Sequence, residues 1–94
     1  MKLDTKNNLV DTFLQIRTKK EMEAFLLSIL TPKEQKELPK RLEIFAMLKK
    51  GIPQHEIAEK VGVGIATVTR GSIELQRGNI QKTSWWRSQA PLGD

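Results

Sequence analysis

The sequence predicts an all-α fold, and three observations carry this prediction. Apolar residues recur at helical spacing along the chain, strand signals are weak, and two Thr-x-x-Glu segments precede apolar stretches as capping boxes do. The chain has 94 residues, which is enough for one small domain. Its hydrophobic fraction of 38% is enough for a core, and a dimer that shares one core would be more stable than a single small domain.

The first two helices are predicted from apolar stripes and caps. An apolar stripe over residues 9–14 indicates a first helix that ends near Arg17. A second helix is expected between the capping boxes at 18–21 and 31–34, because its apolar residues from Met22 to Ile29 follow the i, i+3, i+4, i+7 pattern. Together these segments predict two short amphipathic helices.

A longer third element is expected from Pro32 to Lys50, where Gly51 stops it. Pro32 suits the first helical position, since its missing N–H has no partner there. Pro39 lies inside the element, where proline removes one hydrogen bond and clashes with the preceding turn. We therefore expect a kink or a break near Leu38.

Two shorter helices follow, and their spacing predicts a helix-turn-helix. One is expected from Gln54 to about Val61, with Pro53 at its first position and Gly62 at its end. The next is expected from Gly64 or Ile65 to about Arg77, closed by Gly78-Asn79. Two short helices joined by three or four residues that include glycine are typical of this motif. A small residue at the crossing, a turn glycine and three apolar anchors support it: Ala58, Gly62, Ile57, Val63 and Val68.

The second of these helices carries residues that weaken a helix. The stretch G-V-G-I-A-T-V-T-R-G-S at 62–72 holds three glycines and two threonines. One side is predicted to face the core, and the outer flanks keep small polar residues; the core side holds Ile65, Val68, Ser72 and Leu75, and the flanks hold Ala66, Thr67, Thr69, Arg70 and Ile73. Small side chains allow close approach to the major groove, and threonine can bond to bases or phosphates. The alternative is that the threonines are ordinary exposed residues.

Charge and composition favour an anionic partner and exclude several classes of site. The net charge is +5, with pI near 9.8. Residues 1–50 hold 11 Lys/Arg against 7 Asp/Glu, whereas residues 51–94 hold 5 against 4, so the proposed reading segment is nearly neutral. The chain has no cysteine, and its single histidine, His55, has no partner at metal or catalytic spacing. We expect no metal site, no catalytic residues and no enzymatic activity. No apolar run resembles a signal peptide or a membrane span, so a cytoplasmic protein is expected.

Gly64-Ile65-Ala66-Thr67-Val68-Thr69-Arg70-Gly71-Ser72 resembles the signature segment of the Trp repressor family. Leu30-Thr31-Pro32, with Glu34 and Arg41, resembles the segment that precedes it in that family, and the similarity covers about residues 20–78. The resemblance implies an intertwined helical homodimer that binds operator DNA when L-tryptophan is bound as corepressor. On this basis residues 1–80 form one helical domain, with dimerisation helices in 1–50 and the helix-turn-helix in 52–78, and 81–94 form a partly disordered tail.

The resemblance also implies a tryptophan site. Arg41 and Arg70 match the two arginines that enclose the indole, and guanidinium planes do stack on aromatic faces and pair with carboxylates. The other implied contacts are Thr31 with the ligand carboxylate, Gly71 beside the indole, Glu74 near the ammonium, and the main chain around Ser28 and Leu30, contributed by the partner subunit. The alternative is that both arginines pair with surface glutamates such as Glu37 or Glu74, in which case Glu74 could block the site.

The residues that the resemblance directs toward DNA come from both helices of the motif. Ala58 stands where a lysine is common, which should reduce phosphate or base contact at that position. The full set is Gln54, His55, Ala58, Ile65, Ala66, Thr67 and Thr69.

Two other functions remain open. The N-terminal portion resembles the YerC-type branch of the family, which would make the chain a DNA-binding regulator that acts without tryptophan or with another effector. The near-neutral C-terminal half instead favours a protein-interaction module that never contacts DNA. Trp85 and Trp86 are expected to dock on the dimer core, with stacking on single-stranded nucleic acid as the alternative.

Overall fold

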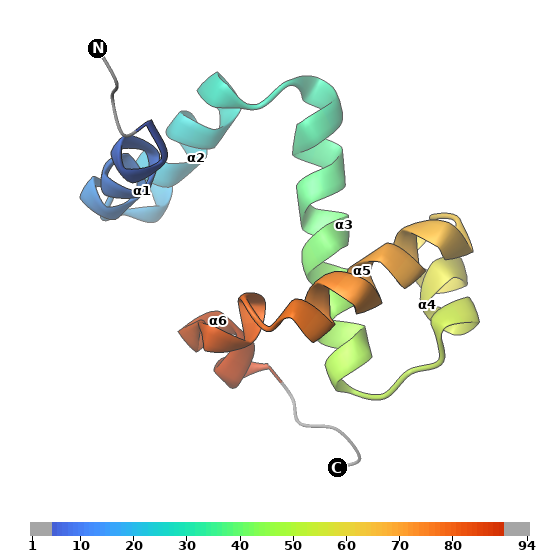
Figure 1. Ribbon diagram of the computed structural model, residues 1–94. Coiled ribbons are helices and arrows are strands. Elements are labelled where there is room, and N and C mark those ends of the chain that lie inside the picture. The colour runs from blue at the N-terminus through green and yellow to red at the C-terminus, as the bar shows by residue number, and fades with distance from the viewer. Residues whose placement is uncertain (1–4, 90–94) are drawn as a thin grey trace. The chain divides into compact units, whose positions relative to one another are not determined.

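The computed structural model describes residues 5–89, and all elements in that range are helices (Figure 1). The predicted all-α fold is therefore confirmed. Contacts divide the chain into two compact units, one up to Gln35 and one from Lys36 onward. The elements are α1 (Thr5–Gln15), α2 (Lys19–Ile29), α3 (Pro32–Lys49), α4 (Gln54–Val61), α5 (Ile65–Arg77), the 3-10 helix η1 (Ile80–Lys82) and α6 (Ser84–Ser88).

The N-terminal unit contains α1, α2 and the first turn of α3. Phe13 and Phe25 join α1 to α2 in an edge-to-face contact, with ring centroids 5.1 Å apart. None of residues 7–35 is buried, and several large apolar side chains are well exposed, including Leu14 at 70% and Leu27 at 64%. This unit therefore has amphipathic helices without a core of its own.

The predicted capping box at the start of α3 is complete, and the one at the start of α2 is present in part. At the start of α3, the Glu34 N–H donates to the Thr31 hydroxyl (3.2 Å) and the Glu34 carboxylate accepts from the Thr31 N–H (2.9 Å). At the start of α2, the Glu21 N–H donates to the Thr18 hydroxyl (3.1 Å), but the Glu21 carboxylate accepts from the N–H of Arg17, one residue earlier (3.3 Å). Local sequence thus sets where both helices begin.

The third helix, α3, runs without interruption from Pro32 to Lys49 with Pro39 inside it. The break considered near Leu38 is therefore wrong. Proline deprives the helix of a single N–H donor, and Pro39 is exposed. The C-terminal part of α3 is held by packing, since Ile44 is almost fully buried at 2% exposure.

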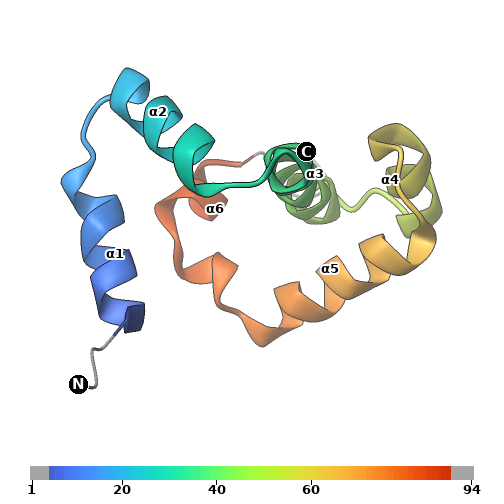
Figure 2. The same ribbon diagram turned by 90° about the horizontal axis from the view of Figure 1, so that it is seen from above.

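The C-terminal unit is organised around one buried residue from each of three helices. Ile44 of α3, Ile57 of α4 and Val68 of α5 form the core, and partly buried apolar residues from α3 to the α4–α5 connection pack around them. Figure 2 shows α3 nearly end-on, with α4 to its right and α5 running below it. This core positions the two helices of the predicted helix-turn-helix.

The connection between α4 and α5 is residues 62–64, within the predicted length. Gly62 ends α4 in the left-handed conformation, with φ of 79°, which a glycine adopts without strain. Two details differ from expectation. Pro53 is the N-cap of α4 and not its first residue, because its ψ of 146° is extended. Ile65 is 50% exposed and not core-facing, because Val63 of the connection packs against the core at that end of α5.

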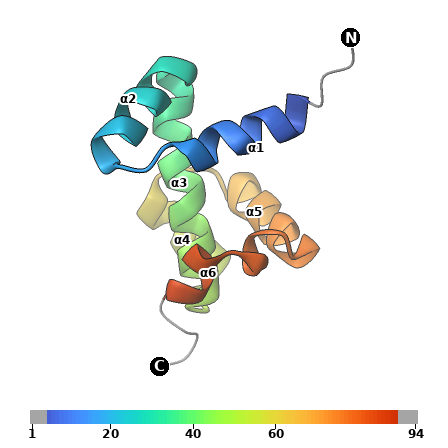
Figure 3. The ribbon, with the colours of Figure 1, turned by 90° about the vertical axis from the view of Figure 1, so that its left-hand side faces the viewer.

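After α5 the chain forms η1 and α6, which lie by the C-terminal end of α3 (Figure 3). The Thr83 hydroxyl caps α6 by accepting from the Trp86 N–H (3.2 Å). The Lys49 ammonium donates to the Trp86 carbonyl and lies 4.8 Å from the centre of the Trp86 ring. Trp85 and Trp86 are both half-buried. The predicted disorder of the tail falls mainly on residues 90–94, which lie outside the described residues.

Within residues 5–89, no helix is long and apolar enough to cross a membrane.

Candidate functional site

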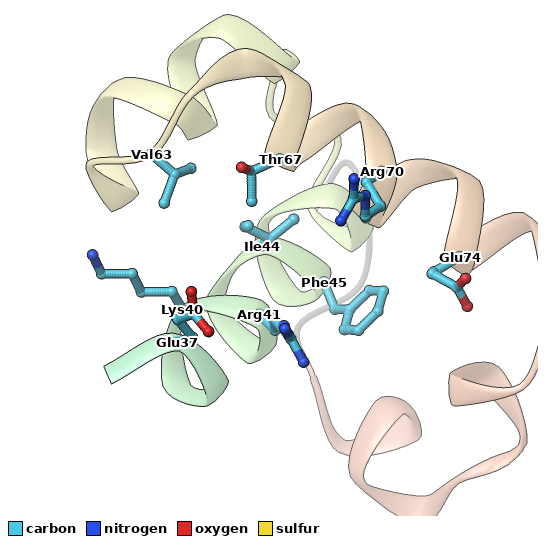
Figure 4. Close-up of a pocket in the computed structure, with 10 residues that line it drawn as sticks. Glu37, Lys40, Arg41, Ile44, Phe45, Val63, Thr67, Arg70 and Glu74 are labelled. Atoms are coloured by element: carbon cyan, nitrogen blue, oxygen red, sulfur yellow. The ribbon is translucent and has the colours of Figure 1, made fainter. Parts of the chain in front are cut away.

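A cavity of about 600 Å³ lies between α3 and α5 in the C-terminal unit (Figure 4). Its volume is typical of pockets for small organic ligands. The lining residues lie at i, i+3, i+4 and i+7 along each helix, with Phe45 at i+8 on α3, so each helix contributes one face. The lining consists of Glu37, Lys40, Arg41, Ile44 and Phe45 from α3, Thr67, Arg70, Gly71 and Glu74 from α5, and Val63 from the connection.

The cavity combines an apolar surface with charged groups. In Figure 4 the side chains of Ile44 and Phe45 lie between the two arginines, Arg41 on α3 and Arg70 on α5. Such an arrangement offers an aromatic or aliphatic surface for a flat ring and two guanidinium groups that can stack on it or bind an anion.

Neither arginine of the cavity is used by the fold. Among the described residues, Arg41 and Arg70 form no ion pair or side-chain hydrogen bond, so the alternative that they pair with surface glutamates is not observed. The Glu74 carboxylate instead pairs with Arg77, 3.0 Å from its guanidinium. Glu74 therefore leaves Arg70 available for a ligand.

At Gly71, α5 approaches α3 closely. A Cβ atom at this position would lie 2.8 Å from the Cγ2 of Ile44, which is shorter than real Cβ contacts. The resemblance assigned Gly71 to the ligand, where a side chain would obstruct the indole. The structure adds a second requirement, because the packing of the two helices also needs a glycine here.

The residues predicted to bind tryptophan fall into two groups. Four of them line the cavity: Arg41, Arg70, Gly71 and Glu74. The other three, Ser28, Leu30 and Thr31, belong to the N-terminal unit. There the Ser28 hydroxyl donates to the Ala24 carbonyl (2.7 Å), and the Leu30 carbonyl accepts from the side-chain amide of Gln35 (3.1 Å). Their contacts with a ligand stay predictions.

Sequence reasoning missed several lining residues, although a simple signal marks most of them. Side chains three or four residues from Arg41 share its helical face. These residues are Glu37, Ile44 and Phe45. Lys40 and Val63 were also missed, and Thr67 was assigned to DNA alone.

The other face of the helix-turn-helix presents some of the residues predicted to meet DNA. Ala66, Thr69 and Ile73 of α5 are exposed and lie at i, i+3 and i+7, away from the buried Val68. His55 is exposed, whereas Ala58 is half-buried against the core. The Thr69 hydroxyl donates to the Gln54 side-chain carbonyl at 2.8 Å, which joins α5 to the start of α4. Their contacts with DNA stay predictions as well.

Comparison with known proteins identifies the family of this chain. Residues 4–90 match the family described as Trp repressor protein. A Trp operon repressor homolog of Vibrio atlanticus is 37% identical over 75 residues, which cover 79% of this chain and 76% of the relative. Another, from Actinobacillus succinogenes, is 32% identical over 88 residues, which cover 93% of this chain and 87% of the relative. No solved structure gives a significant match. The chain belongs to the Trp repressor family.

Proposed function

We propose that this chain is a transcriptional repressor that binds operator DNA as a homodimer, with L-tryptophan bound between α3 and α5 as its corepressor. Family membership makes it a transcriptional regulator and not an enzyme. The single observation that carries the proposal is that α5 presents two groups of predicted site residues on two different faces. Arg70, Gly71 and Glu74 face the cavity, while Ala66 and Thr69 are exposed on another side.

The cavity supports an amino acid with a flat side chain as the effector. Ile44 and Phe45 provide apolar contact, Arg41 and Arg70 provide stacking and carboxylate binding, and Glu74 is near enough to the cavity to receive an ammonium group. A zwitterion with an indole ring satisfies all three features. The charges of the lining thus match both ends of tryptophan.

A ligand in this cavity would act on DNA binding through the position of α5. The cavity is lined by α5 residues between 67 and 74, and α5 contacts α3 closely at Gly71 and Ile44 within this stretch. Filling the cavity restricts how α5 tilts about that contact, which favours one orientation of its N-terminal end. Ligand binding would shift the population toward a DNA-competent spacing of the two motifs in a dimer, roughly 34 Å apart.

The N-terminal helices support the homodimer. Large apolar side chains of α1 and α2 are exposed in the single chain: Leu9, Val10, Leu14, Leu27 and Ile29. Apolar surface of this extent is normally covered by another protein surface. A second copy of the same chain supplies matching helices.

Calorimetry and duplex binding test the proposal together. L-tryptophan is expected to bind with measurable heat and to tighten binding to duplexes selected from a randomised pool. Arg70→Ala should weaken tryptophan binding roughly tenfold or more, because a hydrogen-bonded charged contact is lost, while nonspecific binding at low salt remains. Arg17→Ala removes the same charge outside the cavity lining and should leave both unchanged.

Each proposed element has an outcome that would contradict it. Full tryptophan dependence in Arg70→Ala would exclude the cavity as the effector site. Absence of any duplex shift at low salt would exclude DNA binding and leave the protein-interaction module, since nonspecific binding is strongest under those conditions.

A second candidate is a regulator of the same fold with a different effector. Glu37 adds a second carboxylate to the lining beside Glu74, one more than the single ammonium group of tryptophan requires, while Lys40 adds a third cation beside the two arginines. Titration with a panel of amino acids that includes arginine and lysine separates the two candidates.

A further inference from the structure

The hydrogen bond between Thr69 and Gln54 is the one side-chain hydrogen bond described between α4 and α5. The Thr69 hydroxyl donates to the Gln54 carbonyl oxygen at 2.8 Å, across 15 residues of sequence, and the contact is exposed. An exposed hydrogen bond adds little to folding stability, since water replaces it readily. The contact therefore calls for an explanation beyond the stability of the fold.

This bond sets which part of the Gln54 amide faces outward. A glutamine amide carries an acceptor oxygen and an NH₂ donor at opposite ends of a planar group. With the oxygen turned toward Thr69, the NH₂ group is directed away from it, and it donates to no partner among residues 5–89. The backbone of Gln54 is also held, because it is the first residue of α4 directly after Pro53.

The surroundings of the pair allow a duplex to approach. Ala66 lies one helical turn before Thr69 on α5, is exposed, and has only a methyl side chain. Gln54 lies next to the exposed His55 at the start of α4. The two side chains thus lie on the exposed surface where the N-terminal halves of both helices meet.

The orientation of the amide selects the kind of group that it can bind. A glutamine that rotates freely can read adenine by donating to N7 and accepting from N6. A glutamine whose oxygen is already engaged presents its NH₂ group, which suits acceptors such as guanine O6 and N7 or a phosphate oxygen.

We propose that Gln54 and Thr69 act as one recognition unit for DNA, in which Thr69 positions the amide and Gln54 donates its NH₂ group to an acceptor on the duplex. This inference rests on the proposed DNA-binding function. Thr69 is a positioning residue, and Gln54 is the residue in contact with the acceptor.

A double-mutant cycle on the full chain, with duplexes selected by the wild-type protein in the presence of L-tryptophan, tests the unit. Gln54→Ala and Thr69→Val are each expected to weaken binding roughly five- to tenfold. Thr69→Val in the Gln54→Ala background should add less than about twofold, because the hydroxyl then has no amide to position. Thr69→Ser keeps the hydroxyl and should bind like the wild type.

Gln54→Glu tests the direction of the hydrogen bond to DNA. The carboxylate cannot donate and repels acceptor oxygens, so binding should fall further than in Gln54→Ala. A loss confined to selected duplexes assigns the acceptor to a base edge, and an equal loss on unselected duplexes assigns it to a phosphate; both outcomes support the unit.

Three outcomes overturn the inference. These are equal losses from Thr69→Val in both backgrounds, a Thr69→Ser variant as weak as Thr69→Val, and a Gln54→Glu variant that binds at least as well as Gln54→Ala. Thermal melting by circular dichroism confirms that each variant is folded. If the folded wild-type chain shifts no duplex at low salt, the proposed function itself fails, which is distinguishable from a failure of the cycle.

Discussion

The two compact units of this chain differ in how their apolar residues are used. In the C-terminal unit, Ile57 and Val68 are fully buried and Ile44 is 2% exposed. In the N-terminal unit none of residues 7–35 is buried, and the Phe13–Phe25 pair is the one described ring contact. The helices of both units have apolar stripes, although α2 and α3 begin at threonine caps whereas α4 and α5 have no side-chain cap. The units differ in whether the same chain provides another apolar surface that covers each stripe.

This difference in burial indicates different roles for the two units. The C-terminal unit builds its own core and holds both the cavity and the helix-turn-helix, so it can keep a precise geometry. The N-terminal unit leaves large apolar side chains on its surface and therefore depends on further burial for its stability. Our proposal that a second copy covers this surface leads to the largest effect that we predict.

Leu14→Glu combined with Leu27→Glu is expected to separate the dimer into monomers. Each carboxylate would be buried without a partner in the proposed interface, at a cost of several kcal/mol, so the dissociation constant should rise roughly a hundredfold or more. Sedimentation equilibrium measures this change. Thr12→Glu with Ala24→Glu is the control. It adds the same charge to the same two helices at exposed positions that carry no large apolar side chain, and it should keep the dimer. If the Leu14→Glu, Leu27→Glu variant sediments as a dimer like the wild type, this surface is not the dimer interface.

Gly71→Ala should destabilise the C-terminal unit by about 1–3 kcal/mol, because the new methyl group overlaps the Cγ2 of Ile44. Denaturant unfolding followed by circular dichroism measures the loss. Gly64→Ala is the matched control, since a Cβ there meets nothing within 4 Å. Equal stability of both variants would mean that α5 moves away from α3 at low cost and that the contact does not define the cavity.

Lys49→Met should have the smallest effect, about 1–2 kcal/mol, because it removes one cation–π contact to the Trp86 ring and one hydrogen bond to the Trp86 carbonyl. The change should appear as faster amide exchange in α6 and as an altered tryptophan emission, with little effect on global unfolding. Lys50→Met alters the neighbouring exposed lysine and serves as the control. Unchanged exchange in Lys49→Met would show that α6 is held by the apolar contacts of its indoles.

Much of the secondary structure could be predicted because it depends on local chemistry. The capping threonines at 18 and 31 and the left-handed glycines at 62 and 78 act on their own helix ends, and α2, α4 and α5 have the expected bounds. Pro39 shows the limit of local rules. It does not interrupt α3, whose C-terminal part is held by the packing of Ile44, and no local pattern reports that packing.

The sequence by itself determined the helices, the turn of the helix-turn-helix and the family, because caps, glycines and apolar spacing act over a few residues. The tertiary structure alone decided which faces of α3 and α5 enclose a cavity, that Arg41 and Arg70 stay free of ion pairs among the described residues, and that Thr69 engages Gln54. These features depend on how helices distant in sequence approach one another. That approach follows from the shape of the shared core, where one glycine lets α5 lie against Ile44.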